Sequence, residues 1–193
     1  MKLTFLGTKG EVEKTSKLHR SHSAVRLETH DKTILLDFGT SWQGKLKFIG
    51  RPDYIWLSHA HPDHAFGLKN ERIEIPIFMT KETSERLPEN KFPFLDRKIV
   101  KGNFKFDSIQ AQEISVEHST VAPTSGLIIH TDQGKIGYFP DVLDIPNKGV
   151  LRGLSIYIGD GSSLTRNTMR MADGKKVGHA STATQMAWCQ GEE

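Results

Sequence analysis

The sequence is poor in cysteine, in long apolar runs and in net charge, and each lack excludes a class of protein. Cys189 is the only cysteine among 193 residues, so disulfide frameworks within the chain and thiolate metal cages are excluded. No apolar run approaches the roughly 18 residues of a membrane span. The first residues are too mixed in character for the apolar centre of a signal peptide. We therefore expect a cytoplasmic protein without membrane contact.

The composition is that of an ordinary globular protein. Hydrophobic residues make up 36% of the chain and charged residues 25%, which excludes wholesale disorder. The formal charge of +3 is too small to argue for stable nucleic-acid binding. At this length, with no linker or repeat, a single domain over residues 1–193 is expected.

Short runs rich in Val, Ile, Phe and Tyr predict many strands. They lie at residues 2–6, 24–28, 33–37, 54–58, 74–79, 112–116, 126–131, 135–139 and 154–158. Fewer segments predict helices: residues 62–68, 81–87 and a last one after Thr182, which has capping-box spacing to Gln185. This order predicts an α+β domain of packed sheets with helices outside.

The clearest chemical signal is the motif H-x-H-x-D-H, which follows the apolar run at residues 54–58. Its members are His59, His61, Asp63 and His64. Imidazole and carboxylate are the ligands that zinc and similar divalent ions take when no thiolate is present. Four such groups within six residues predict two adjacent metal ions rather than one closed structural site.

This motif resembles the first signature of the metallo-β-lactamase superfamily, whose fold is a layered αββα sandwich. The resemblance implies three further ligands: His118 and His179 match the family's later histidines, and Asp141 matches its bridging aspartate. It implies His59, His61 and His118 on one ion. Asp63, His64 and His179 would hold the other ion, with Asp141 bridging the pair.

Two such ions activate a bridging water as hydroxide and neutralise charge on a phosphoryl or carbonyl oxygen. Asp63 and Asp141 are the carboxylates expected to act in catalysis. Zinc suits the histidine-rich set, and Mn²⁺ or Fe²⁺ fits imidazole and carboxylate too.

Several other residues have two possible roles each. Asp37 either supports ligating histidines, as the family's early aspartate does, or forms a turn. Asp160 is a turn residue or an acid of the cleft, and Ser162 binds a substrate oxygen or caps that turn. Arg166 and Arg170, with Lys175 and Lys176, either hold a phosphate or form an exposed charged loop.

The remaining histidines lack partners at ligand spacing. We interpret His130, within the run 126–131, as structural. His19, His22 and His30 are expected to be exposed.

Within the superfamily, the ligand set and the residues around His118 resemble the ribonuclease Z and cyclic phosphodiesterase branch. The stretch between His118 and Asp141 leaves no room for the tRNA-binding arm of ribonuclease Z. The function implied is phosphodiester hydrolysis of a small nucleotide or nucleic-acid fragment. A thioester hydrolase of the glyoxalase II type and a non-catalytic nucleotide-binding module are the alternatives, and a homodimer is left open.

Overall fold

The computed structural model describes residues 1–12, 15–17 and 19–191, and it divides into two compact units. Unit 1 comprises residues 1–100 and unit 2 residues 101–193, and each is described by itself. The single domain over 1–193 stays a prediction. No helix of the described ranges is long and apolar enough to cross a membrane.

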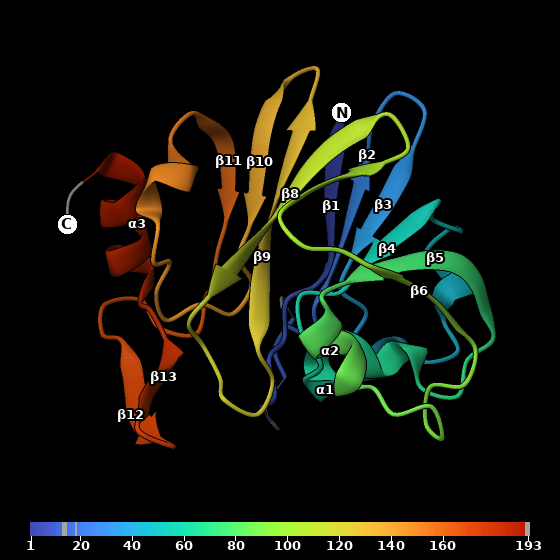
Figure 1. Cartoon of the computed structure of the whole chain (residues 1–193), viewed down its shortest axis with the longest axis horizontal. Coiled ribbons are helices and arrows are strands. Elements are labelled where there is room, and N and C mark those ends of the chain that lie inside the picture. The colour runs from blue at the N-terminus through green and yellow to red at the C-terminus, as the bar shows by residue number, and fades with distance from the viewer. Residues whose placement is uncertain (13–14, 18, 192–193) are drawn as a thin grey trace. The chain divides into compact units, whose positions relative to one another are not determined.

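In the described part of unit 1, six strands form one mixed sheet in the order of the chain (Figure 1). They are β1 (Lys2–Gly7), β2 (Ala24–Glu28), β3 (Thr33–Leu36), β4 (Tyr54–Trp56), β5 (Ile73–Met79) and β6 (Leu95–Ile99). Strands β1, β2 and β3 pair antiparallel, whereas β3 to β6 pair parallel. The carboxyl ends of β3 and β4 therefore open at the same edge of the sheet.

Apolar side chains on one face of this sheet form the core of unit 1. In β5, the buried Ile73, Ile75 and Ile77 alternate with more exposed residues, as a strand period of two requires. Pro76 interrupts this strand where its register with β6 shifts, so the missing N–H falls at an irregularity of the ladder.

Both predicted helices of unit 1 are present and shorter than expected. The α-helix α1 (Pro62–Ala65) is followed by a 3-10 turn over Phe66–Leu68. Helix α2 (Lys81–Glu85) begins after Thr80, whose hydroxyl accepts the N–H of Thr83.

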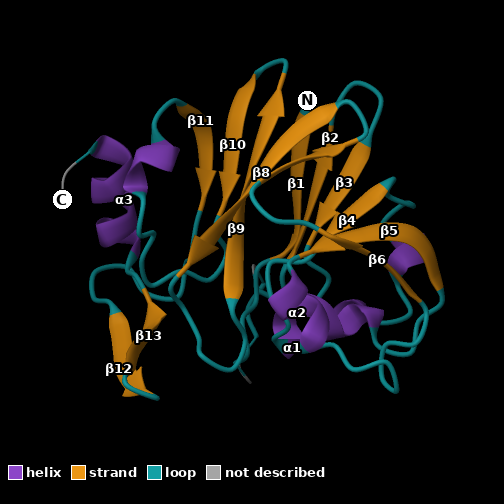
Figure 2. Ribbon diagram, viewed as in Figure 1, coloured by secondary structure: helices purple, strands orange, loops and turns teal. Residues whose placement is uncertain are grey.

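In the described residues of unit 2, 101–191, five strands form a second sheet in the order β11-β10-β9-β8-β7, and two more form a separate ribbon (Figure 2). The elements are β7 (Asn103–Phe106), β8 (Ile109–Val116), β9 (Thr124–Thr131), β10 (Gly134–Tyr138), β11 (Leu154–Ile158), β12 (Thr168–Ala172), β13 (Lys175–His179) and α3 (Thr182–Gln190). The core includes Ile114, Ile128, Phe139 and Trp188, the last from α3.

The cap of α3 differs from the prediction. Ser181, rather than Thr182, precedes the helix, and its hydroxyl accepts the N–H of Thr184. Gln185 is therefore not the reciprocal partner of a capping box. Its buried amide instead bonds the backbone at Asp160 and Ala180.

The nine predicted strands are confirmed with small shifts of their ends, whereas β6, β7, β12 and β13 were missed. The side chains of β12 are mostly exposed, so no apolar alternation marks this strand. The available signal was Asp173-Gly174, which joins β12 to β13 with positive φ at both residues, as a type I′ turn requires.

We predict that Gly126→Ala destabilises the protein. A Cβ on Gly126 would lie 2.2 Å from Cδ1 of Phe139, a fully buried ring that also stacks on Tyr157. Overpacking of this kind costs about 1–3 kcal/mol, which urea unfolding measures. Gly161→Ala is the control, because a Cβ there meets nothing within 4 Å. Equal stability of the two variants would contradict the prediction.

Candidate metal centre

The carboxylate of Asp37 organises the segment that follows β4. Asp37 comes directly after β3, is fully buried, and has a φ of 60°. Its Oδ1 accepts the N–H of Ser58 at 2.8 Å, and its Oδ2 accepts the Ser58 hydroxyl at 2.8 Å. The same Oδ2 lies 2.7 Å from Nδ1 of His64. Asp37 is thus a support for the motif and not merely a turn residue.

These contacts fix the proton positions on two histidines. An ionised carboxylate only accepts, so His64 must carry its proton on Nδ1. The Ser58 hydroxyl donates to Asp37, so its oxygen accepts from Nδ1 of His59, 2.9 Å away. In both rings the Nε2 atom therefore keeps its lone pair, which is the form that binds a metal.

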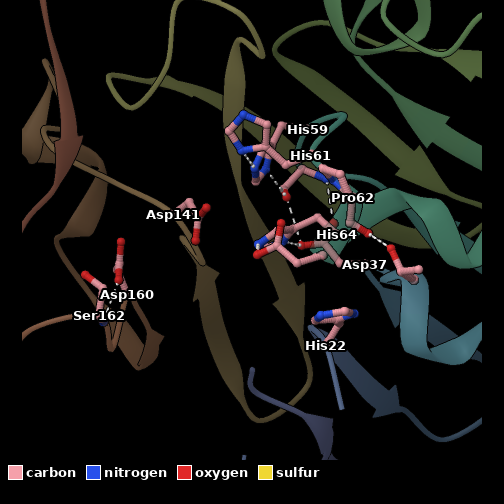
Figure 3. Close-up of polar contacts among 12 residues, drawn as sticks. His22, Asp37, His59, His61, Pro62, His64, Asp141, Asp160 and Ser162 are labelled. Carbon is pink, nitrogen blue, oxygen red and sulfur yellow. Dashed lines mark hydrogen bonds and ion pairs between the residues drawn. The ribbon is translucent and has the colours of Figure 1, made fainter. Parts of the chain in front are cut away.

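The ligand atoms of unit 1 lie in two close pairs. Nε2 of His59 is 3.0 Å from Nδ1 of His61, and the two rings meet edge to face (Figure 3). Nitrogens that bind one zinc tetrahedrally at about 2.0–2.1 Å lie roughly 3.3 Å apart. Oδ2 of Asp63 lies 3.4 Å from Nε2 of His64. Each pair has the spacing of neighbouring ligands on one ion.

Helix α1 is held tightly against the end of β3. The backbone N–H of Ser23 donates to the carbonyl of Asp63, and that of Phe38 donates to the carbonyl of His64. A Cβ on Gly39 would lie 2.0 Å from the Asp63 carbonyl, so only glycine allows this approach. The Asp63 and His64 side chains are consequently fixed by the backbone as well as by Asp37.

His22 lies near this cluster and is half-buried, which corrects the expectation that it is exposed. The N–H of Ser41 donates to its Nδ1 at 3.1 Å, so its proton is on Nε2. Burial lowers the pKa of His22, whereas the charge of Asp63 opposes this shift. No sequence signal marked this residue, because Ser41 reaches it only through the fold.

In unit 2, His118 follows β8 and is bound by the ribbon. Its Nδ1 donates to the carbonyl of Gly178 at 2.9 Å, which leaves Nε2 with its lone pair. That Nε2 lies 3.3 Å from Oδ2 of Asp141, which follows β10. The rings of His118 and His179 have centroids 4.7 Å apart.

His179, the last residue of β13, is oriented by Asp160. Its Nδ1 lies 2.6 Å from Oδ2 of Asp160, a carboxylate that is 5% exposed. The N–H groups of Val142 and Ser162 donate to the same carboxylate, and Gln185 binds the backbone of Asp160. Asp160 therefore supports His179 and closes a turn at once. Asp141, Asp160 and His179 each offer one ligand atom within 4.8 Å of one another.

The donor set of each unit fits divalent metal ions. His59, His64, His118 and His179 each have one ring nitrogen held by a hydroxyl, carboxylate or carbonyl. Metal-binding histidines almost always show this second hydrogen bond, because it fixes the tautomer and the direction of the lone pair. Asp63 and Asp141 add carboxylates, so the donor set combines imidazole and carboxylate ligands, which divalent ions take.

The other predicted residues lie outside these clusters. Ser162 is exposed, and its backbone N–H donates to the carboxylate of Asp160. Arg166 and Arg170 are exposed, the first in a loop and the second on β12. The remaining histidines behave as expected: His130 is half-buried in β9, and His19 and His30 are exposed.

Comparison with known proteins places these observations in a family. Residues 32–191 match the family described as the Beta-lactamase superfamily domain. A ribonuclease Z of Bradyrhizobium diazoefficiens is 41% identical over 70 residues, which is 34% of this chain and 22% of that protein. The chain thus spans only about a fifth of this relative.

Two solved structures share the fold. A diphosphatase of the PhnP family has a TM-score of 0.76 at 18% identity and covers 98% of this chain and 81% of its own. Zinc-bound PqqB from Methylobacterium extorquens has a TM-score of 0.60 at 15% identity, over 75% of this chain and 62% of its own. The predicted fold class is confirmed. The family match covers most of the sequence, and it agrees with the motif after β4 and with the hydrogen-bonded histidines of both units. The chain therefore belongs to the β-lactamase superfamily.

Proposed function

We propose that this protein is a dinuclear metal-dependent hydrolase that cleaves phosphodiester bonds. The proposed ligands of one ion are His59, His61 and His118. Those of the other are Asp63, His64 and His179, and Asp141 would be a ligand of both. This assignment follows the family resemblance, and the local geometry of each unit supports it.

The observation that carries the proposal is the chain of hydrogen bonds that begins at Asp37. One carboxylate sets the tautomers of both His59 and His64, in the state that leaves a lone pair on each Nε2. Seven ligands on two ions also leave positions for water and substrate, as a catalytic site requires.

Two divalent ions would supply Lewis-acid stabilisation of charge on phosphoryl oxygens and would lower the pKa of a bound water molecule. The protein's own part is to orient its ligands and to move a proton. Asp63 and Asp141 are the proposed catalytic carboxylates. Their Oδ2 atoms lie 3.4 Å from Nε2 of His64 and 3.3 Å from Nε2 of His118. A carboxylate beside the ions would accept the proton of the attacking water.

A small phosphodiester or nucleotide is the proposed substrate. The relatives include proteins named as a ribonuclease Z and a diphosphatase, and both names concern phosphorus–oxygen bonds. The zinc in the PqqB structure and the imidazole-rich donor set favour zinc as the metal. We further propose that the protein acts in the cytoplasm.

The zinc-loaded protein is expected to hydrolyse bis-p-nitrophenyl phosphate. His61→Ala is expected to lower kcat at least about 100-fold, because loss of a ligand should cost at least as much as loss of a ligand's hydrogen-bond partner. The release of p-nitrophenol measures both. His30→Ala is the matched control, because His30 is an exposed histidine outside the motif. S-lactoylglutathione should be cleaved more slowly. Faster cleavage of this thioester would favour a hydrolase of the glyoxalase II type, and tight nucleotide binding without turnover would favour a binding module.

Asp37→Asn is expected to weaken metal binding by roughly 10–100-fold while the protein stays folded. The asparagine oxygen must face the Ser58 N–H, so its NH₂ group takes the place of Oδ2. This NH₂ group then donates to Ser58 Oγ and to Nδ1 of His64. The Ser58 hydroxyl in turn donates to Nδ1 of His59, so His59 and His64 both carry their protons on Nε2.

Chelator competition measures the metal affinity in this test, and circular dichroism measures the fold. Asp53→Asn is the control, because the exposed Asp53 also accepts a backbone N–H but contacts no histidine. Unchanged metal affinity in folded Asp37→Asn would show that this carboxylate does not set the ligand tautomers.

A further inference from the structure

A pocket of about 660 Å³ lies beside His118, built entirely from unit 2. One wall is the end of β8 with the loop that follows it, residues 115–120 with Pro123 and Thr124. The other wall is the first part of β13, Lys175, Lys176 and Val177. The pocket therefore includes one candidate ligand, His118, whereas its other lining residues are not part of the proposed metal centre.

The two walls are fastened to each other by hydrogen bonds. The N–H of Gly178 donates to the carbonyl of His118 at 2.8 Å, and the His118 ring donates back to the Gly178 carbonyl. At the tip of the ribbon, the hydroxyl of Thr120 donates to Asp173 at 3.1 Å. Gly178 has a φ of 138°, and a Cβ there would lie 1.9 Å from the Thr168 carbonyl, so this close packing requires glycine.

Lys175 and Lys176 are thus held within three residues of the contact with His118. Both are exposed, and neither forms an ion pair with another described residue.

The charge of the pocket favours an anion. Two lysines, Lys175 and Lys176, line it against one acidic residue, Glu117. Asp173 lies at the tip of the ribbon and is bound by Thr120. The Ser119 oxygen accepts the N–H of Ala122, which leaves its own proton able to donate. Ammonium groups and a hydroxyl are suitable donors for a phosphate, whose several oxygens accept them at once.

We propose that this pocket binds a second, non-reacting phosphate group of the substrate. The inference rests on the proposed phosphodiesterase function and narrows it: the substrate is a phosphodiester that also carries a phosphate monoester. It also replaces Arg166 and Arg170 by Lys175 and Lys176 as the groups that hold this phosphate, because the arginines do not line the pocket.

Calorimetric titration tests the pocket with two probes, thymidine 3′,5′-bisphosphate and thymidine 5′-monophosphate, at one fixed salt concentration. The zinc-loaded protein is expected to bind the bisphosphate about tenfold more tightly, as charge-assisted hydrogen bonds to one further phosphate allow. In the double variant Lys175→Gln/Lys176→Gln the ratio of the two affinities should fall to about one. Glu117→Gln should raise the ratio several-fold, because it removes the opposing charge.

Lys135→Gln is the matched control, because Lys135 is an exposed lysine of β10 away from the pocket lining, and it should keep the wild-type ratio. Equal affinity for the two probes in the wild-type protein overturns the proposal, and so does a preference that survives in the double lysine variant.

Binding is measured without turnover, so the two proposals can fail separately. A protein that prefers the bisphosphate but hydrolyses no phosphodiester contradicts the proposed reaction and leaves the pocket supported.

Discussion

The buried contact between Asp37 and its three partners is the constraint on which the first half of the candidate site depends. One carboxylate accepts a backbone N–H, a hydroxyl and an imidazole N–H, and it is fully buried. Removal of a buried acceptor leaves such donors unsatisfied, which costs about 1–3 kcal/mol for each group. The same bonds determine on which nitrogen His59 and His64 carry their protons. Stability and ligand orientation therefore come from one interaction.

In unit 2, different groups orient the candidate histidine ligands. A backbone carbonyl orients His118, and the carboxylate of Asp160 orients His179. Asp160 is itself held by two backbone N–H groups and by the buried amide of Gln185. Burial raises the pKa of Tyr157 well above its usual range, so this hydroxyl stays protonated and donates to Gln185. The hydrogen bonds that support His179 thus run from Asp160 to Gln185, and from Gln185 to Tyr157.

The ribbon β12–β13 both contacts a candidate metal ligand and lines the neighbouring pocket. Gly178 holds His118 by two hydrogen bonds, and Lys175 and Lys176 of the same strand line the neighbouring pocket. The side chains of β12 are mostly exposed, so this strand adds little to the core of unit 2.

The sequence by itself determined the motif at residues 59–64, the family, the fold class and most strands of both sheets. Those features follow from local patterns: apolar alternation marks half-buried strands, and closely spaced imidazole and carboxylate groups mark metal chemistry. Only the tertiary structure decided that Asp37 and Asp160 support histidines, that His22 is half-buried, and that Ser181 rather than Thr182 caps α3. It alone showed the ribbon and its pocket. Each of these depends on a contact between residues distant in the chain or on an exposed strand without apolar alternation, and neither leaves a periodic trace in a single sequence.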